Sequence, residues 1–352
     1  MLFNLEHHLF LGLVLNLNVE IISFIMQIAI YLGLVLNELL DYNITAKAVA
    51  ASANRVLCLV IAKCKVLGGV TYHVFTKLYD SLVSPIIEYG ASIWGYKNLF
   101  CINTIHNRAC QFFLGVGKYT PNAAVTGDMG WLPFFHKQWK RIIRLWCRLN
   151  NMTSDRLNRK VFVWSNCMSL SHKCVKNLNC FVNKTFCDLN LSSFCNILEN
   201  VDTTFIVNSV MSRLFDKHVN DWHNCLSLER SVSGRGGNKL RTYRLFKNSF
   251  ETEIYCKIAL PFSHQSAFAK FRCGVAPLRI ETGRFENLRI EERICCFCND
   301  FIEDETHVLL NCPFYDDFRE NLFNVAKSYT VDFMSSNNEE NILFLFTNFK
   351  KT

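Results

Sequence analysis

The sequence predicts a mostly α-helical protein, with a small β segment near its start and a small Cys3His zinc module near its end. Two stretches, 75–86 and 137–149, place apolar residues at the three- and four-residue spacing of an amphipathic helix. A third stretch, 28–36, is an apolar run with β-branched residues, which is typical of a strand. The zinc module is predicted from the spacing of Cys and His between residues 295 and 312.

Composition narrows the class of protein. The 352 residues can hold two or three domains, and with 50% hydrophobic and 19% charged residues disorder is not favoured. The net charge of +8 weakly favours a polyanionic partner such as nucleic acid. The 17 Cys residues are scattered and odd in number, and the start shows no convincing secretion signal. We therefore expect an intracellular protein of the cytoplasm or nucleus, where a tight Cys/His cluster indicates a metal site.

The apolar segment near the start has two interpretations. Val19–Leu36 is close to the length that spans a bilayer, so a membrane-tethered protein anchored by residues 19–36 is one hypothesis. Glu20 and Gln27 interrupt the segment, however, and its β-branched residues favour one or two buried strands, with a strand at Ile28–Leu36. We favour the strands, and a membrane partner is not expected.

The helices are located from apolar spacing and stop signals. A helix over 46–65 is expected to end before Gly68-Gly69, and Pro85 is expected to kink or divide the helix that begins at Phe75. In 137–149, apolar residues occupy one face and basic residues the other. The Asn-, Ser- and Cys-rich stretch 161–225 shows no clear pattern. After it we expect a flexible link at 231–238, a basic helix at LRTYRLFKNSF, and a helix and tail in the last twenty residues.

The metal-ligand pattern is Cys295-x2-Cys298-x8-His307-x4-Cys312. Two Cys separated by two residues can direct both sulfurs to one ion, and a Cys3His set makes a closed structural zinc site. On an unbroken helix Cys312 would point about 140° away from His307, but Pro313 biases it out of helical geometry. Cys296 is an alternative first ligand, although a one-residue gap closes poorly on a single metal. The bland interpretation is four unrelated residues of a Cys-rich chain.

Two basic stretches are candidate nucleic-acid contacts. On the 137–149 face, each cation can displace a counterion from a phosphate backbone; these residues are Lys137, Lys140, Arg141, Arg144 and Arg148. In the second stretch aromatic side chains interleave with the cations, which suits RNA or single strands; the cations are Lys239, Arg241, Arg244 and Lys247. The alternatives are a solvated surface helix for the first stretch and a packed amphipathic helix for the second.

No catalytic residues are predicted. The letters FYDD at 314–317 resemble the aromatic-x-Asp-Asp turn of reverse transcriptases, but a two-metal site needs a hairpin between apolar strands and a third carboxylate. Asp316 and Asp317 fit better as acids in the first turn of a helix. The chain also has no Walker loop and no nucleophile elbow. We therefore expect no enzymatic activity and no small-molecule substrate.

Three stretches, in order, resemble the C-terminal part of non-LTR, LINE-type retrotransposon reverse transcriptases. YLGLVLNELLDYN (31–43) is similar to the end of the palm, and VFTKLYDSLVSPIIEYGASIWG (74–95) to the helical segment that follows, with its Tyr-Gly and Trp-Gly signature. The stretch 284–319, with Cys-x2-Cys, Cys-Pro-x-Tyr and a trailing Arg, resembles the C-terminal zinc-binding module. The likeness covers about 28–320, and the family's polymerase aspartates would lie before it.

The resemblance implies an organisation and partners. It divides the chain into a palm-end remnant (1–44), a thumb-like helical region (45–160), a connector (161–232), a basic helix with the zinc module (233–330) and a tail (331–352). The thumb-like helices would hold template-primer, and the module would hold element RNA or target DNA, with a full-length reverse transcriptase as a further partner. The leading hypothesis is a retroelement fragment that binds zinc and nucleic acid without synthesising DNA. A non-functional remnant is the second hypothesis.

Overall fold

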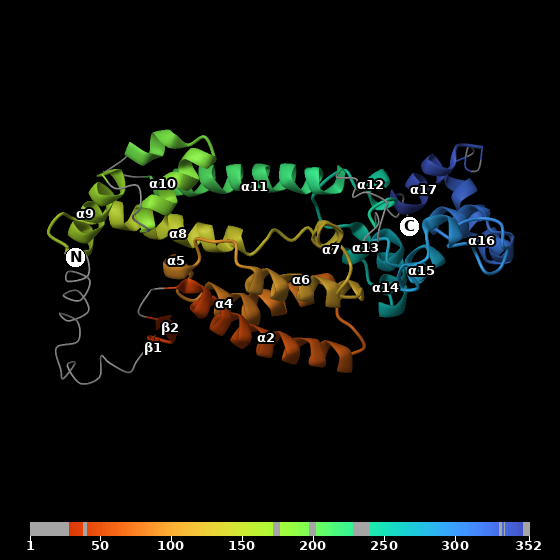
Figure 1. Ribbon diagram of the computed structural model, residues 1–352, viewed down its shortest axis with the longest axis horizontal. Coiled ribbons are helices and arrows are strands. Elements are labelled where there is room, and N and C mark those ends of the chain that lie inside the picture. Colours follow the sequence, from red (N-terminus) through yellow and green to blue (C-terminus); the bar gives the residue numbers. More distant parts are fainter. Residues whose placement is uncertain are drawn as a thin grey trace.

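The computed structural model describes residues 28–37, 41–171, 177–196, 202–227, 239–330, 333 and 335–347. These residues are mostly helical, with a two-stranded antiparallel sheet near the start, so the predicted fold class is confirmed. The helices form an elongated body, with the sheet beside the first helix and the C-terminal helices at the opposite end of the long axis (Figure 1).

The sheet is a hairpin, and the prediction of a single strand over Ile28–Leu36 is wrong. Strand β1 (Ile28–Tyr31) pairs with β2 (Leu34–Asn37). The two residues between them, Leu32 and Gly33, have φ of 46° and 81°, which reverses the chain in a tight turn. Leucine seldom adopts this conformation, so the turn has no sequence signal. The expected burial holds for only one strand: Ile30 of β1 is 75% exposed, whereas Leu34 of β2 is buried in the first core. Because residues 28–37 form this hairpin, they are not part of a membrane-spanning helix. Residues 19–27 of the proposed anchor lie outside the described residues.

Helix α2 (Tyr42–Val66) organises the first core. Asp41 caps its start, and its last turn ends at the predicted Gly68-Gly69 stop. Its buried residues recur every three or four positions and face α6 (Phe100–Leu114). Within the described residues, α2 is the one helix long and apolar enough to cross a membrane; its buried stripe is equally that of a core helix.

Pro85 divides the next helix, as predicted. The chain runs through α3 (Tyr72–Leu78), a π-helical turn η1 (Tyr79–Val83) and α4 (Ser84–Glu88), with Pro85 in the first turn of α4. Proline lacks the N–H that would continue the ladder, so the helix restarts there. The short α5 (Ala91–Trp94) follows, and Trp94 is buried in the core shared with α2 and α6.

A second layer contains the stretch in which no pattern was recognised. Helix α7 (Asn122–Met129) leads to α8 (Phe135–Asn150), the predicted amphipathic helix. Helix α8 lies along α11 (Thr203–Ser227), a helix of 25 residues (Figure 1). Helices α9 (Leu157–Ser171) and α10 (Leu178–Asp188) and the 3₁₀ turn η2 (Ser192–Asn196) cover one end of this pair.

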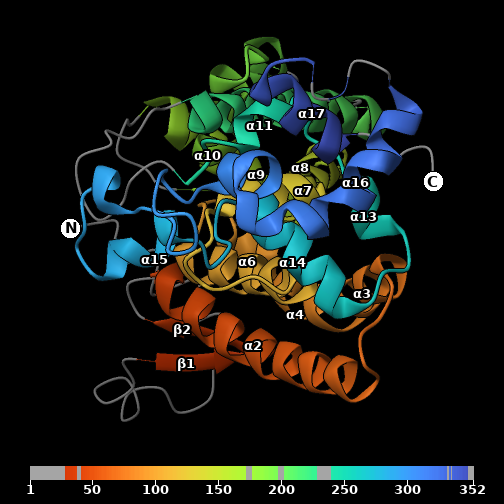
Figure 2. The same cartoon turned by 90° about the vertical axis from the view of Figure 1, so that its right-hand side faces the viewer.

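The C-terminal part is built of short helices around a third core. The expected basic helix is wrong in length, because only α12 (Tyr243–Phe246) is helical there. Figure 2 shows these helices from the end of the long axis. The remaining elements are α13 (Ile254–Lys257), α14 (Phe262–Arg272), α15 (Arg279–Phe285), η3 (Ile290–Glu292), η4 (His307–Asn311), η5 (Pro313–Tyr315), α16 (Asp316–Tyr329) and α17 (Asn338–Thr347).

Candidate metal centre

The structure brings the four predicted ligands together. One ligand atom from each of Cys295, Cys298, His307 and Cys312 lies within 4.8 Å of the others. The sulfurs of Cys295 and Cys312 are 3.8 Å apart, and the sulfur of Cys298 is 3.3 Å from His307 Nε2. With zinc–sulfur bonds of about 2.3 Å and zinc–nitrogen bonds of about 2.0 Å, a tetrahedral site has edges of about 3.8 and 3.5 Å. The arrangement therefore fits a single tetrahedral metal ion.

The Cys295–Cys298 pair is set on a tight knuckle. An antiparallel bridge joins Ile294 to Ile302, and the N–H of Cys295 donates to the carbonyl of Phe301 at 2.8 Å. The N–H of Asn299 donates to the carbonyl of Cys295, and Asn299 has a left-handed φ of 60°. Asparagine tolerates this conformation better than most residues. The knuckle turns both sulfurs to the same side, as the spacing predicted.

A π-helical turn supplies the other two ligands. The carboxylate of Asp304 accepts from the N–H of His307 at 2.8 Å and caps the turn, and the N–H of Cys312 donates to the carbonyl of His307 at 2.8 Å. This bond between residues five apart widens the helix, so Cys312 returns over His307. Cys312 itself is extended, at φ −70° and ψ 121°, as expected before Pro313. The widened turn was not predicted.

Arg319 fixes the backbone of Cys312, the last of the four ligands. Its buried guanidinium donates to the carbonyl of Cys312 and pairs with Asp316. This gives the trailing Arg of the motif a positioning role that its presence in the sequence did not reveal. Cys296, the alternative ligand, is exposed and lies outside the cluster.

The surroundings of the thiols suit a divalent cation. Burial raises the pKa of Cys312 to about 11, and the neighbouring Cys295 raises it as well. Backbone N–H groups of Asp300 and then Phe301 lower the pKa of Cys298. Three thiolates at this distance repel one another unless a metal ion binds them, and a bound ion deprotonates them outright. Because Cys295, His307 and Cys312 are buried, an ion bound by them would be largely shielded from solvent.

The FYDD letters lie outside any catalytic cluster. Asp316 and Asp317 occupy the first turn of α16, as predicted. Across the part of the chain that the structure describes, the Cys3His group is the one cluster of three or more His, Cys, Asp or Glu side chains able to hold a metal.

The basic face of α8 is on the surface but partly neutralised. Lys137 pairs with Asp80 at 2.6 Å, and Arg141 forms an ion pair with Glu88. The remaining three cations are exposed, and no ion pair joins them to another described residue; they are Lys140, Arg144 and Arg148. Those three are the cations of α8 best placed to bind a phosphate backbone.

The second basic stretch serves mainly internal contacts. Arg241 pairs with Glu305 at 2.7 Å and with Glu281 at 3.1 Å, and Arg244 donates to the carbonyl of Leu240. Lys247 is buried beside Glu253, so its predicted role as a phosphate contact is wrong. The sequence could not show that Arg241 forms internal ion pairs, because Glu281 and Glu305 lie 40 and 64 positions away from it. Lys239 is half-buried and donates to the carbonyl of Tyr119.

Charge is strongly segregated along the molecule. Residues 137–160 contain eight Lys or Arg and one Asp, a net charge of +7, whereas residues 290–320 contain nine Asp or Glu and two Arg, a net charge of −7. Helices α8 and α9 lie at one end of the long axis, and the module between α15 and α16 lies at the other (Figure 1). The metal centre is therefore in an acidic environment, and the cations gather elsewhere.

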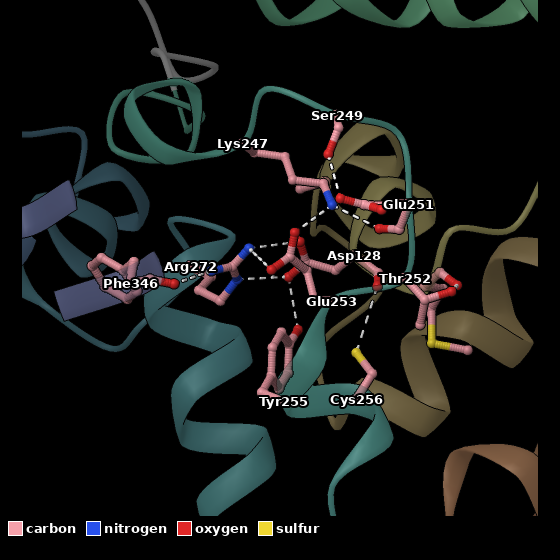
Figure 3. Close-up of polar contacts among 12 residues, drawn as sticks. Asp128, Lys247, Ser249, Glu251, Thr252, Glu253, Tyr255, Cys256, Arg272 and Phe346 are labelled. Atoms are coloured by element: carbon pink, nitrogen blue, oxygen red, sulfur yellow. Dashed lines mark hydrogen bonds and ion pairs between the residues drawn. The ribbon is translucent and has the colours of Figure 1, made fainter. Parts of the chain in front are cut away.

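A buried ion network joins α7 to the C-terminal part, and its members gave no signal in the sequence. Asp128 is 0% exposed, and Arg272 Nε and Nη2 contact its two carboxylate oxygens at 3.0 and 3.2 Å. The hydroxyls of Tyr255 and Tyr243 donate to the same carboxylate at 2.7 and 3.0 Å. Figure 3 shows Arg272 also reaching the carbonyl of Phe346 and Glu253, with Lys247 on the other side of Glu253. Every charge is paired, so the network is structural.

Comparisons with protein families, with curated proteins and with solved structures give no match for this chain.

Proposed function

We propose that the chain is the thumb and zinc-module region of a non-LTR, LINE-type reverse transcriptase, and that it binds zinc and nucleic acid. The observation that carries the proposal is the convergence of three sulfurs and one imidazole within 4.8 Å, from a motif that resembles this family's C-terminal module. The other two resembling stretches precede the module in the expected order.

Zinc is the metal that the donor set favours. Thiolate and imidazole ligands select soft or borderline ions over Mg²⁺ and Ca²⁺. All four positions of the tetrahedron are supplied by the chain, so the ion organises the fold of residues 290–320 and leaves no open position for chemistry.

The charge distribution supports α8, rather than the module, as the surface that binds the polyanion. Residues 290–320, with a net charge of −7, repel phosphates, and three thiolates with one divalent ion add one further negative charge. The +7 segment attracts them and releases their counterions. Element RNA and target DNA are the partners that the family resemblance implies, and a full-length reverse transcriptase would supply the catalytic palm.

Polymerase activity is not part of the proposal. The described residues hold no carboxylate cluster for two metals, so a primer-extension assay with the purified protein should show no incorporation. Robust incorporation by the chain alone would overturn this part of the proposal.

Replacing Lys140, Arg144 and Arg148 together by Gln is expected to weaken binding to RNA and DNA alike. Removal of each phosphate-binding cation should reduce the slope of log K against log salt by about 0.7 for single strands and about 0.9 for duplex DNA. The full variant should therefore lose about two to three units of slope, because all three cations are exposed. Fluorescence anisotropy over a salt series measures this.

The matched control is Arg289→Gln, whose side chain is 81% exposed but lies in the acidic module beside Glu292. It should leave the salt slope unchanged. An unchanged slope in the triple variant would contradict the assignment to α8. A chain that purifies without zinc and binds neither nucleic acid would support the non-functional remnant instead.

A further inference from the structure

A cavity of about 410 Å³ lies where three distant segments meet. Tyr119 comes from the loop between α6 and α7, Lys239 from the segment before α12, and the other lining residues are Arg284, Phe285 and Asn287 at the end of α15. The volume is within the range of about 300–1,000 Å³ that small ligands occupy. None of its lining residues belongs to α8 or to the predicted metal ligands.

Backbone contacts fix the walls. The ammonium of Lys239 donates to the carbonyl of Tyr119 at 3.0 Å, which joins two of the three segments. The carbonyl of Lys239 rests against Gly274, where a Cβ would come within 1.8 Å of it and φ is +63°. On the third wall, Arg284 pairs with Glu281 at 2.8 Å, and Asn287 turns the chain with a left-handed φ of 58°. The cavity is therefore preformed.

The lining has the chemistry of a nucleotide site. Tyr119 is 68% exposed and Phe285 is 78% exposed, so both rings are open to a ligand. The ammonium of Lys118 lies 4.8 Å from the centre of the Tyr119 ring, and the ammonium of Lys239 uses one of its three donors on Tyr119. Aromatic faces beside cations bind single strands because every base has a π-face and every linkage a phosphate.

The acidic side chains near the cavity repel an anionic ligand only weakly, because each is paired with arginine. Glu281 is held by Arg241 at 3.1 Å as well as by Arg284, and Glu286 is paired with Arg279 at 2.5 Å. Their charges are matched by guanidinium groups, so the ammonium of Lys239 is the cation of the lining that can meet the phosphate of a ligand.

We propose that this cavity takes one unstacked nucleotide of a single strand, with its base against Tyr119 or Phe285 and its phosphate at Lys239. The inference rests on the proposed nucleic-acid binding and adds a site that reads an unpaired base. It makes the protein prefer single strands to duplex of equal length, since a paired base cannot enter.

The test is photocrosslinking and binding with a 12-nucleotide oligouridylate that carries 4-thiouridine. The crosslinked nucleotide should map to the peptides that contain Tyr119 or Phe285. Tyr119→Ala with Phe285→Ala should weaken binding about tenfold for each ring that stacks on a base, with no change in salt slope. Tyr119→Phe keeps the ring and should bind as the wild type does. Phe100→Ala, at a ring 86% exposed on α6 outside the cavity, is the matched control.

Three outcomes separate the two proposals. Crosslinks at the cavity together with weaker binding by the ring-deleted variant support the inference. Crosslinks only at α8, with full affinity in that variant, overturn the cavity site and leave the proposed nucleic-acid binding standing. Absence of any binding by the wild-type, zinc-loaded protein overturns both.

Discussion

Cys312→Ser is expected to strip the metal from the protein and unfold the module around residues 290–320. Binding free energies of structural zinc sites are about 10–16 kcal/mol, which matches or exceeds the about 5–15 kcal/mol that stabilises a whole domain. The other contacts of the knuckle are a single antiparallel bridge, backbone hydrogen bonds and the stack of Phe297 on Phe314, and each of these contributes far less than the bound ion. Loss of one thiolate should therefore remove most of the local stability.

Elemental analysis and amide hydrogen exchange measure the effect. The wild-type chain should carry one zinc ion, and the amides of Cys295 and Cys312 should be protected until a chelator is added. Cys296→Ser is the matched control, because Cys296 is exposed and adjacent to a ligand without belonging to the cluster. It should retain the metal. No stoichiometric metal in the wild type, or equal metal in both variants, would show that the four residues do not form the site.

Asp128→Asn is expected to destabilise the protein by about 3–5 kcal/mol, the usual cost of breaking a buried pair by removing one charge. The Arg272 guanidinium, 1% exposed, would keep only Glu253 as a charged partner. It would also lose the bidentate geometry that joins α7 to α14. Urea denaturation at neutral pH measures the change. Glu292→Gln removes an exposed pair with Arg289 and should cost no more than about 1 kcal/mol. A similar loss of unfolding free energy in both variants would show that the buried network stabilises the protein no more than an exposed ion pair does.

The same carboxylate predicts a dependence of stability on pH. Burial alone would raise the pKa of Asp128, but Arg272 and then Lys247 and Tyr255 outweigh it and lower the pKa below its ordinary value. Because the folded pKa is the lower one, the contribution is complete above about pH 4 and is lost as the pH falls through the folded pKa. Asp128→Asn should flatten this acid limb of the stability curve. An acid limb identical to that of the wild type would count against the role of Asp128.

The features that could be predicted from the sequence are those whose residues lie close together along the chain. Helix α8 and the division at Pro85 follow from local spacing and from the missing proline N–H, and both are confirmed. The ligand set was found because its four members lie close together in the sequence and their spacing reports directly on one ion. The residues 203–227 were missed although their buried positions recur every three or four residues, because Asn, Ser and Cys interrupt the pattern.

Long-range pairing could not be predicted. Asp128 and Arg272 are separated by 144 positions, and nothing near either residue indicates the other. The same holds for Lys247, whose basic neighbours suggested a surface although its side chain is buried against Glu253. The hairpin turn at Leu32-Gly33 was not predicted for a different reason: a leucine with left-handed backbone contradicts the residue preferences on which turn prediction depends.

The separation of +7 and −7 to opposite ends makes the protein a large electric dipole. If nucleic acid is the partner, as proposed, its field would turn the protein before contact so that α8 and α9 approach first. Approach in this orientation is fast and weakens steeply with salt. Contact through α8 would keep the acidic side chains of residues 290–320 away from the phosphates, so that they stay available to a positively charged surface, and the cavity at Phe285 would take its nucleotide just outside that segment.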